Sequence, residues 1–252
     1  MNHLSLRETL RFLERFLPAA PARVLEVGAG EGALARALAA RAYAVTALDE
    51  ALDPEVTAAA VGLPAGTPPI VWVQEDFLQF QPAGLYDVVV FTRSLHHIQP
   101  TGRALDRALE ALAPEGLLLA EEVAIDRVNV VTARWLYDLE AVLVAAEVID
   151  DPEPAHAAET RPLARWRLEH AWDPPLASGH DMLAAARERF DLIAVEEAPY
   201  LYRYLAARAR EGPRAGPRAR RVVEALFELE SRLIRERDIA AAGLRFAGRR
   251  RD

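Results

Sequence analysis

Hydrophobic positions in the first half of the chain form short apolar runs separated by helical stretches. Strand-length runs occur at Arg23–Val27, Ala44–Leu48, Ile70–Gln74, Tyr86–Thr92 and Leu117–Val123. Helical periodicity is expected over Leu6–Phe16, Glu31–Arg41, Ala51–Val61 and Thr101–Ala113. Ser5 and Glu8 have capping-box spacing and place the first helix start near Leu6. Strands alternating with helices at this spacing predict a parallel sheet with right-handed crossovers.

The alternation stops after Val123. The later pattern predicts helices over Val131–Val148, Asp181–Arg189 and Ala219–Ala241, and strands over Leu192–Glu196 and Leu244–Ala247. We therefore expect an α/β fold: a Rossmann-like, doubly wound, mostly parallel seven-stranded sheet with helices on both faces and a helical insertion after the fifth strand. The expected division is a cofactor-binding core over residues 1–125, a substrate cap over 126–180, and a C-terminal part over 181–252 that completes the sheet and adds a helix.

The amino-acid composition excludes several kinds of catalytic and metal-binding site. The chain has 252 residues, 52% of them hydrophobic and 27% charged, which is typical of a globular protein. The lack of cysteine excludes disulfides, thiolate catalysis and cysteine-based metal sites. All 30 basic residues are Arg, so Schiff-base lysines are excluded as well. Apolar runs reach only strand length and no apolar leader opens the chain, so we expect a cytoplasmic protein without a membrane partner.

Charge is distributed unevenly around a net value of −8. Residues 1–199 hold 31 acids and 16 Arg, whereas residues 200–252 hold 7 acids and 14 Arg. An acidic protein is a poor general binder of nucleic acid, so no nucleic-acid partner is expected. We interpret the basic end as a solvated helix face with pairs such as Glu228/Arg232.

A glycine-rich turn follows the first predicted strand, and Asp49 ends the second. The turn satisfies a dinucleotide pattern, Gly28-x-Gly30-x-x-Ala33. The same turn also contains Glu26-x-Gly28-x-Gly30-x-Gly32. In this second pattern an acid stands two residues before the first glycine, and the third glycine comes one place earlier than the dinucleotide pattern requires. The turn by itself indicates a nucleoside-bearing cofactor and leaves its identity open.

Further motifs follow in order along the chain: Glu75-Asp76-Phe77, Tyr86-Asp87-Val88-Val89-Val90, Leu95-His96-His97-Ile98 and Leu112-Ala113-Pro114-Glu115-Gly116-Leu117. Together with the turn and Asp49, they resemble the class I S-adenosylmethionine-dependent methyltransferases, in their small-molecule, methyltransferase type 11/12-like branch. The resemblance covers most of the chain. It implies S-adenosylmethionine as cofactor, S-adenosylhomocysteine as product and a small-molecule methyl acceptor. The segment from Asp126 to His180 matches no substrate signature.

The resemblance also implies roles for individual residues. Glu26 or its neighbours would meet the cofactor ammonium, Asp49 the ribose hydroxyls, and Asp76 the adenine amino group with Phe77 beside the ring. The expected cofactor-binding residues are Glu26, Gly28, Ala29, Gly30, Gly32, Asp49, Glu50, Asp76, Phe77, Thr92 and Arg93. Structural alternatives are a helix N-cap for Asp49, an Asx turn for Asp76 and bonds to loop amides for Glu26.

Methyl transfer requires the nucleophile to be held in line with the methyl carbon and sulfur, at roughly 3–3.5 Å from the methyl group. A general base is needed only when the nucleophile is a hydroxyl or an acidic carbon. His96 and His97 follow the fourth strand and are the candidate catalytic residues. The alternative is that one caps the next helix and the other packs beneath the cofactor.

The expected acceptor-binding residues are Ser94, Glu121, Tyr137, His170 and His180. Arg93 and Ser94 share one loop and are suited to an anionic substrate group. Strand alternation sends Glu121 and Glu122 to opposite faces, so at most one of them faces the site.

Other functional classes fit less well. We assign no metal site, because the spacing of Glu169, His170, His180 and Asp181 matches no standard zinc pattern. A nicotinamide-dependent oxidoreductase remains an alternative, although the absence of Lys excludes a Tyr/Lys proton relay. A non-catalytic cofactor-binding relative is a second alternative, supported by the basic C-terminal segment. Nucleic-acid methylation is disfavoured, because Thr92-Arg93-Ser94-Leu95 stands where an Asn/Asp-Pro-Pro-aromatic motif would lie.

Overall fold

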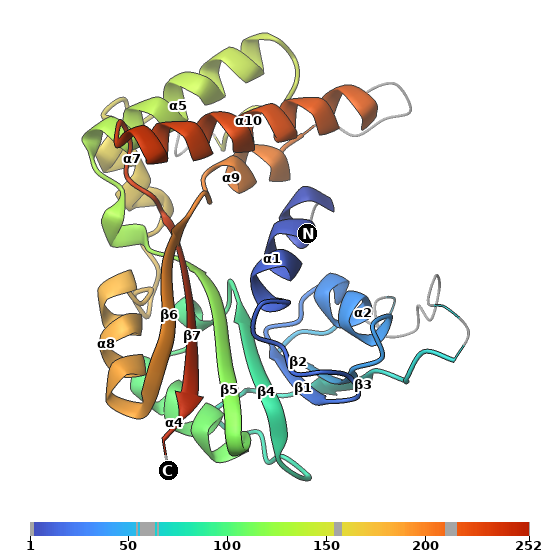
Figure 1. The fold of residues 1–252 in the computed structure, drawn as a ribbon. Helices are drawn as coiled ribbons and strands as arrows, with labels where there is room; N and C mark the ends of the chain where they lie inside the picture. The colour runs from blue at the N-terminus through green and yellow to red at the C-terminus, as the bar shows by residue number, and fades with distance from the viewer. Residues whose placement is uncertain are drawn as a thin grey trace.

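A seven-stranded sheet forms the centre of the molecule in the computed structural model, which describes residues 3–53, 55, 64, 66–153, 158–209 and 216–251 (Figure 1). The strands are β1 Arg23–Val27, β2 Ala44–Asp49, β3 Val71–Gln74, β4 Tyr86–Thr92, β5 Leu112–Val123, β6 Phe190–Ala198 and β7 Gly243–Arg250. Their spatial order is β3-β2-β1-β4-β5-β7-β6, and β7 alone runs antiparallel to its neighbours β5 and β6. The predicted Rossmann-like, mostly parallel sheet is confirmed.

Helices surround this sheet. They are α1 His3–Leu13, α2 Ala33–Ala39, α4 Thr101–Ala111, α5 Val130–Ala145, α7 Pro162–Glu169, α8 Gly179–Arg189, α9 Tyr202–Ala207 and α10 Gly216–Glu236, with the short 3₁₀ turns η1 Leu95–His97 and η2 Ile125–Arg127. The helix predicted over residues 51–61 lies largely outside the described residues. None of the described helices combines the length and apolar character needed to cross a membrane.

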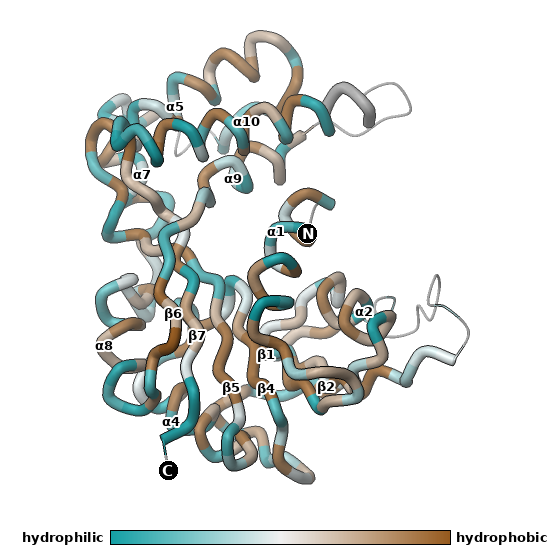
Figure 2. The backbone as a smooth tube through the Cα atoms, in the orientation of Figure 1, coloured by the Kyte–Doolittle hydropathy of each residue, from teal (hydrophilic) through white to brown (hydrophobic). Residues whose placement is uncertain are grey.

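Both sheet faces are buried under helices. One apolar cluster joins the sheet to α4 and α8, and another joins it to α1 and α2. Val88, Val89 and Val90 of β4 are all fully buried because successive side chains enter opposite clusters. Apolar residues accordingly run along the central strands (Figure 2). This double cover explains why β4 reads as a continuous apolar run.

A layer made of α5, α7, α9 and α10 lies beyond the upper ends of the sheet strands (Figure 1). Glu230 of α10 is fully buried there, and its carboxylate accepts the backbone N–H groups of Tyr200, Leu201 and Tyr202 at 2.7–2.9 Å. An anion placed on free amides at a helix start stabilises that helix. This contact ties α9 to α10 and fixes the chain as it leaves β6.

Several predicted boundaries are corrected. The first helix begins at His3, so Ser5 and Glu8 lie inside it, and the Ser5 carbonyl accepts a bond from the Thr9 hydroxyl. The capping box occurs instead at Ser178 and Asp181, at the start of α8. The short helices α7 and α9 were not predicted. The strands β5, β6 and β7 extend beyond their predicted ends, because pairing with neighbouring strands continues past the apolar segments.

Candidate functional site

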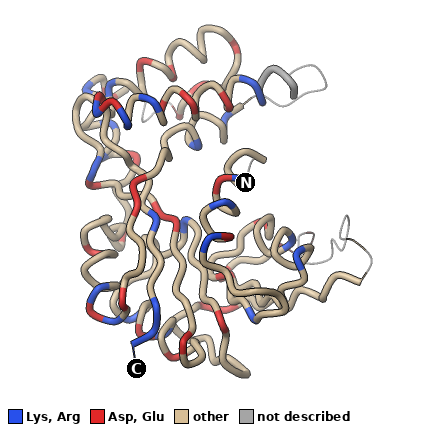
Figure 3. Tube along the Cα trace, viewed as in Figure 1, with Lys and Arg blue, Asp and Glu red and all other residues tan. Residues whose placement is uncertain are grey.

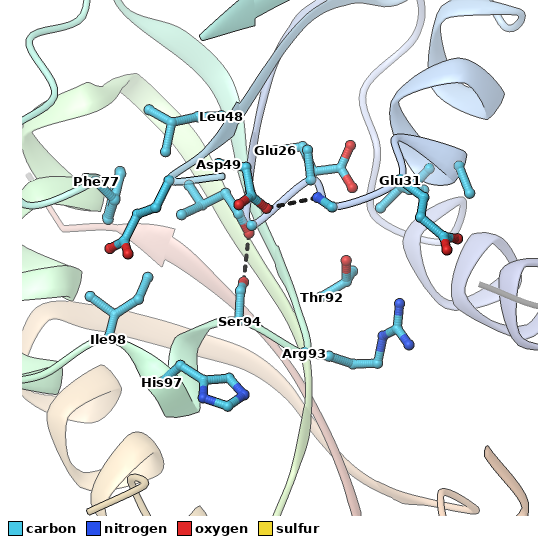
Figure 4. Close-up of a pocket in the computed structure, with 17 residues that line it drawn as sticks. Glu26, Glu31, Leu48, Asp49, Phe77, Thr92, Arg93, Ser94, His97 and Ile98 are labelled. Carbon is cyan, nitrogen blue, oxygen red and sulfur yellow. Dashed lines mark hydrogen bonds between the residues drawn. The ribbon is translucent and has the colours of Figure 1, made fainter. Parts of the chain in front are cut away.

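A pocket of about 570 Å³ opens at the carboxyl edge of β1, β2 and β4 (Figure 4). Its size suits a small-molecule site, since such pockets span roughly 300–1,000 Å³. Predicted residues that line it are Glu26, Gly28, Ala29, Gly30, Asp49, Glu50, Phe77, Thr92, Arg93, Ser94 and His97. Predicted residues that do not line it are Gly32, Asp76, His96, Glu121, Tyr137, His170 and His180.

Three glycines shape the turn between β1 and α2, with φ angles of 78°, 51° and 67° at Gly28, Gly30 and Gly32. A Cβ at Gly28 would lie 2.3 Å from Cβ of Ser94, so only glycine lets the turn lie against the β4–η1 loop. A Cβ at Gly30 would meet no atom within 4 Å. Gly32 packs against Trp72, where a Cβ would lie 2.2 Å from the ring. Gly32 thus packs against Trp72 outside the pocket lining, and its contact with the cofactor stays a prediction.

The Asp49 carboxylate braces this turn. Its Oδ2 accepts the Gly30 N–H at 2.7 Å, and its Oδ1 accepts the Ala51 N–H at 3.0 Å (Figure 4). Each carboxylate oxygen keeps a second lone pair that a ligand hydroxyl can use. The residue thus serves the local turn and still borders the pocket.

Asp76 and Phe77 take different positions. Asp76 Oδ1 accepts the Leu78 N–H at 2.8 Å, which is the Asx-turn alternative. Phe77 is buried, borders the pocket and packs edge-to-face on Phe91 with ring centres 5.5 Å apart. Only Phe77 of this predicted pair reaches the pocket wall.

Glu26, the next-to-last residue of β1, lies in the pocket wall with only 1% of its surface exposed. Among the described residues its Oε2 has no hydrogen-bond partner. Burial raises the pKa of its carboxyl to about 8, although the nearby Arg93 charge opposes this increase. Glu26 therefore holds a proton at neutral pH until a cation approaches.

The β4–η1 loop is locked in place by buried hydrogen bonds. The Ser94 hydroxyl donates to the Val27 carbonyl at 2.5 Å (Figure 4). Oε1 of Glu122 accepts the N–H groups of Ser94 and Leu95 at 3.1 and 3.0 Å, while Oε2 lies 2.5 Å from His96 Nδ1. Ser94, predicted to bind the acceptor, uses its hydroxyl to join the loop to β1. Glu122 was not selected from the sequence, although strand alternation required one of the two adjacent glutamates to face this side.

The two histidines separate into a buried and an accessible one. His96 is 5% exposed and paired with Glu122 beneath the loop, as in the packing alternative. His97 lines the pocket, and its ring centre lies 4.9 Å from that of Trp172 and 4.2 Å from that of His96. Partial burial, reinforced by the neighbouring His96, lowers the pKa of His97. At neutral pH His97 is therefore a free base able to accept a proton.

Glu121, predicted to bind the acceptor, lies outside the pocket lining. Glu121 points toward α1 and is buried with Arg203 and Arg245, whose Nη2 atoms lie 2.9 and 2.5 Å from its oxygens, and the Thr9 hydroxyl donates to it. Burial alone would raise the pKa of Glu121, but the two Arg charges lower it to about 2. The charges gather where β5 and β7 approach the helical layer (Figure 3). This cluster joins α1, α9 and the sheet.

Of the remaining predicted acceptor residues, Tyr137 and His170 belong to the helical layer, whereas His180 belongs to α8. The Tyr137 hydroxyl donates to Glu169 at 2.7 Å. His170 Nδ1 donates to the Trp166 carbonyl at 2.8 Å, so its Nε2 accepts the Tyr204 hydroxyl at 2.9 Å. The exposed His180 lies in the first turn of α8. Within the described part of the chain, no three His, Asp or Glu side chains gather as a metal site.

Comparison with known proteins identifies related sequences. Residues 1–170 match a family model described as a methyltransferase domain. The chain is 37% identical over 107 residues to an uncharacterized methyltransferase of Mycobacterium tuberculosis, covering 42% of this chain and 53% of that protein. It is 33% identical over 116 residues to the ubiquinone biosynthesis O-methyltransferase of Xylella fastidiosa, covering 45% and 47%. The chain thus spans about half the length of the curated relatives it matches.

A solved structure with the same fold is the N-methyltransferase NodS of Bradyrhizobium japonicum in complex with S-adenosylhomocysteine. Its TM-score is 0.55 at 17% sequence identity, covering 100% of this chain and 89% of that chain. At this level of identity the similarity establishes a shared fold.

Proposed function

Because the chain belongs to the methyltransferase-domain family, we propose that it binds S-adenosylmethionine and transfers the methyl group to a small-molecule acceptor. The observation that carries the proposal is the pocket itself. A glycine turn, an acidic strand end and the Thr92–Ile98 segment meet at the carboxyl edge of a parallel sheet. In open α/β sheets, ligands bind at this edge.

The pocket wall suits this cofactor in charge and shape. Glu26, Glu31, Asp49 and Glu50 line it, and the cofactor carries a sulfonium and an ammonium. The buried, unpartnered Oε2 of Glu26 provides an acceptor for the ammonium. Asp49 and Glu50, which line the pocket, would accept ribose hydroxyls, and Phe77 would offer an apolar surface to the adenine. The open space over Gly30 leaves backbone accessible to the ligand.

When bound, the cofactor supplies an electrophilic methyl group. The chain's own residues hold the reactants and handle the proton. Asp49 and the glycine turn fix one side of the pocket, while His97 borders the opposite side beside Trp172. We assign His97 the role of general base for a hydroxyl or acidic-carbon acceptor, and we assign His96 and Glu122 the role of holding the loop.

A small acceptor agrees with the size of the pocket and with a relative named as an O-methyltransferase of ubiquinone biosynthesis. The helical layer and the loop that holds Trp172 would form the wall above the acceptor. The family match argues against the nicotinamide-dependent alternative.

Transfer of labelled methyl groups from S-adenosylmethionine to pooled small metabolites tests this function. With an acceptor that must lose a proton, His97→Gln should lower kcat by about 10²–10⁴-fold. The wild-type rate should fall at acidic pH as His97 becomes protonated, with a midpoint below that of an ordinary histidine. In the His97→Gln variant, the rate should no longer fall at acidic pH with this midpoint. Unchanged kcat and pH profile in the variant would rule out His97 as the base.

A further inference from the structure

The helix α5 presents apolar side chains on a face that the rest of the described chain leaves open. Its inner face is firmly packed: Leu143 belongs to the apolar cluster of the helical layer, and the Glu140 carboxylate lies 2.7 Å from the Arg165 guanidinium. On the opposite face, Val131 and Val142 are 57% and 63% exposed. Exposed apolar residues that share one face indicate an interaction surface, whereas scattered ones do not.

The outer face of α5 has the residue spacing of a helix–helix interface. At 3.6 residues per turn, one line along the helix is formed by Val131, Trp135, Asp138 and Val142. The intervals of four, three and four residues are those of a coiled-coil seam. Arg134 lies beside this line, one turn from Asp138. We call these five residues the outer face of α5.

This face differs from the exposed face of α10, the other long helix of the layer. From Arg220 to Glu236, every exposed position of α10 except Ala225 is charged, as expected for a helix that faces water. Apolar residues instead recur along the whole of α5 (Figure 2), which forms the upper edge of the layer (Figure 1). A helix that is apolar on opposite sides is normally covered on both.

The outer face of α5 is complementary to itself when two copies of the helix run antiparallel. A two-fold axis at the middle of α5 brings together positions that lie equally far from its centre. Val131 then faces Val142 of the second copy, and Arg134 lies beside the second copy's Asp138. Neither of these two charged side chains pairs with another described residue. Trp135 lies on the other side of the line, where it would meet the apolar side of the second helix.

We propose that α5 is a dimerisation helix, which packs antiparallel against α5 of a second copy of this chain. The inference goes beyond the proposed function and requires neither cofactor nor acceptor. A lipid surface fits less well, because the face carries one cation, Arg134, and one anion, Asp138, whereas helices that lie on membranes have several cations on their polar side. The 16 residues of α5 span about 24 Å, so the interface is small and the dimer should dissociate in roughly the micromolar range.

Sedimentation of the full chain between about 1 µM and 1 mM tests the proposal. The wild type should change from monomer to dimer over this range. Val131→Glu should weaken association about 100-fold, since a buried apolar contact is lost twice in a two-fold dimer. The variant should stay folded, because an acid in the first turn of α5 favours the helix. Val71→Glu, the same change at an exposed valine of β3, should associate as the wild type does.

Charge variants test the antiparallel register. Arg134→Glu and Asp138→Arg should each be monomeric, because like charges would face one another across the two-fold axis. An equimolar mixture of the two variants should form dimers, because the acids of one variant then meet the arginines of the other. A mixture that stays monomeric would overturn this pairing.

The whole proposal has equally direct contrary results. A wild type that is monomeric at every concentration, or a Val131→Glu variant that dimerises as the wild type does, would overturn it. Binding of the monomeric wild type to phosphatidylcholine vesicles, lost in Val131→Glu, would also overturn it and assign the face to a lipid surface.

Discussion

Replacing Gly28 by alanine is expected to remove measurable cofactor binding and to lower the free energy of unfolding by about 2–5 kcal/mol. The added Cβ would lie 2.3 Å from Cβ of Ser94, and the φ of 78° is unfavourable for alanine. Overpacking costs about 1–3 kcal/mol, and a left-handed alanine adds about 1–2 kcal/mol. Because Ser94 is bonded to Val27 and Glu122, it cannot retreat without disturbing the pocket wall.

Gly30→Ala is the matched control. Gly30 also has a positive φ, 51°, but a Cβ there would meet no atom within 4 Å. The free energy of unfolding of this variant should fall only by the conformational cost of about 1–2 kcal/mol, and the variant should fold normally. Chemical denaturation measures the stabilities of both variants. Equal stability of the two would show that the close approach of Gly28 to Ser94 is unimportant.

Replacing Glu26 by glutamine is expected to weaken cofactor binding by about 10- to 100-fold, since a charge-assisted bond to the ammonium is lost. It should also abolish a proton release. With a pKa of about 8, Glu26 is mostly protonated in the free protein at pH 7, and an ammonium beside it favours the ionised form. Calorimetry in buffers with different ionisation enthalpies should therefore report a proton released when the wild type binds cofactor, and none from Glu26 in the variant.

The same group makes stability depend on pH in a defined direction. The pKa of Glu26 is about 8 in the folded protein and about 4.5 as an ordinary glutamate. Between these values the folded state holds more protons than the unfolded state, so the contribution of Glu26 to stability falls as pH rises. Glu26→Gln should therefore gain stability relative to wild type from pH 5 to pH 8. A stability difference that does not change with pH would contradict the buried, protonated Glu26.

Much of the fold follows from local patterns in the sequence. The run at Val88–Val90 predicts a central strand because burial on both faces permits no polar alternation. The helix α9 could not be predicted in this way. Its first amides are satisfied by Glu230, a residue of α10 about thirty positions later in the chain. Local propensity contains no signal of that long-range contact.

The candidate site likewise combines features that local sequence patterns predict with features that depend on long-range contacts. The glycine turn and Asp49 are recognisable because their chemistry and spacing are local. Choosing between Glu121 and Glu122 required the strand register, and the position of Glu121 depends on Arg203 and Arg245, more than eighty residues away in sequence. Asp76 was ambiguous because its carboxylate suits both a turn and a ligand; the structure shows the turn contact with Leu78, and the ligand contact stays a prediction.

Titration of the wild-type chain with S-adenosylmethionine, S-adenosylhomocysteine and NADH tests directly which cofactor the pocket binds. We expect saturable binding of the first two at one site, in roughly the micromolar range, and no binding of NADH. Binding of NADH with no response to S-adenosylmethionine or S-adenosylhomocysteine would contradict it.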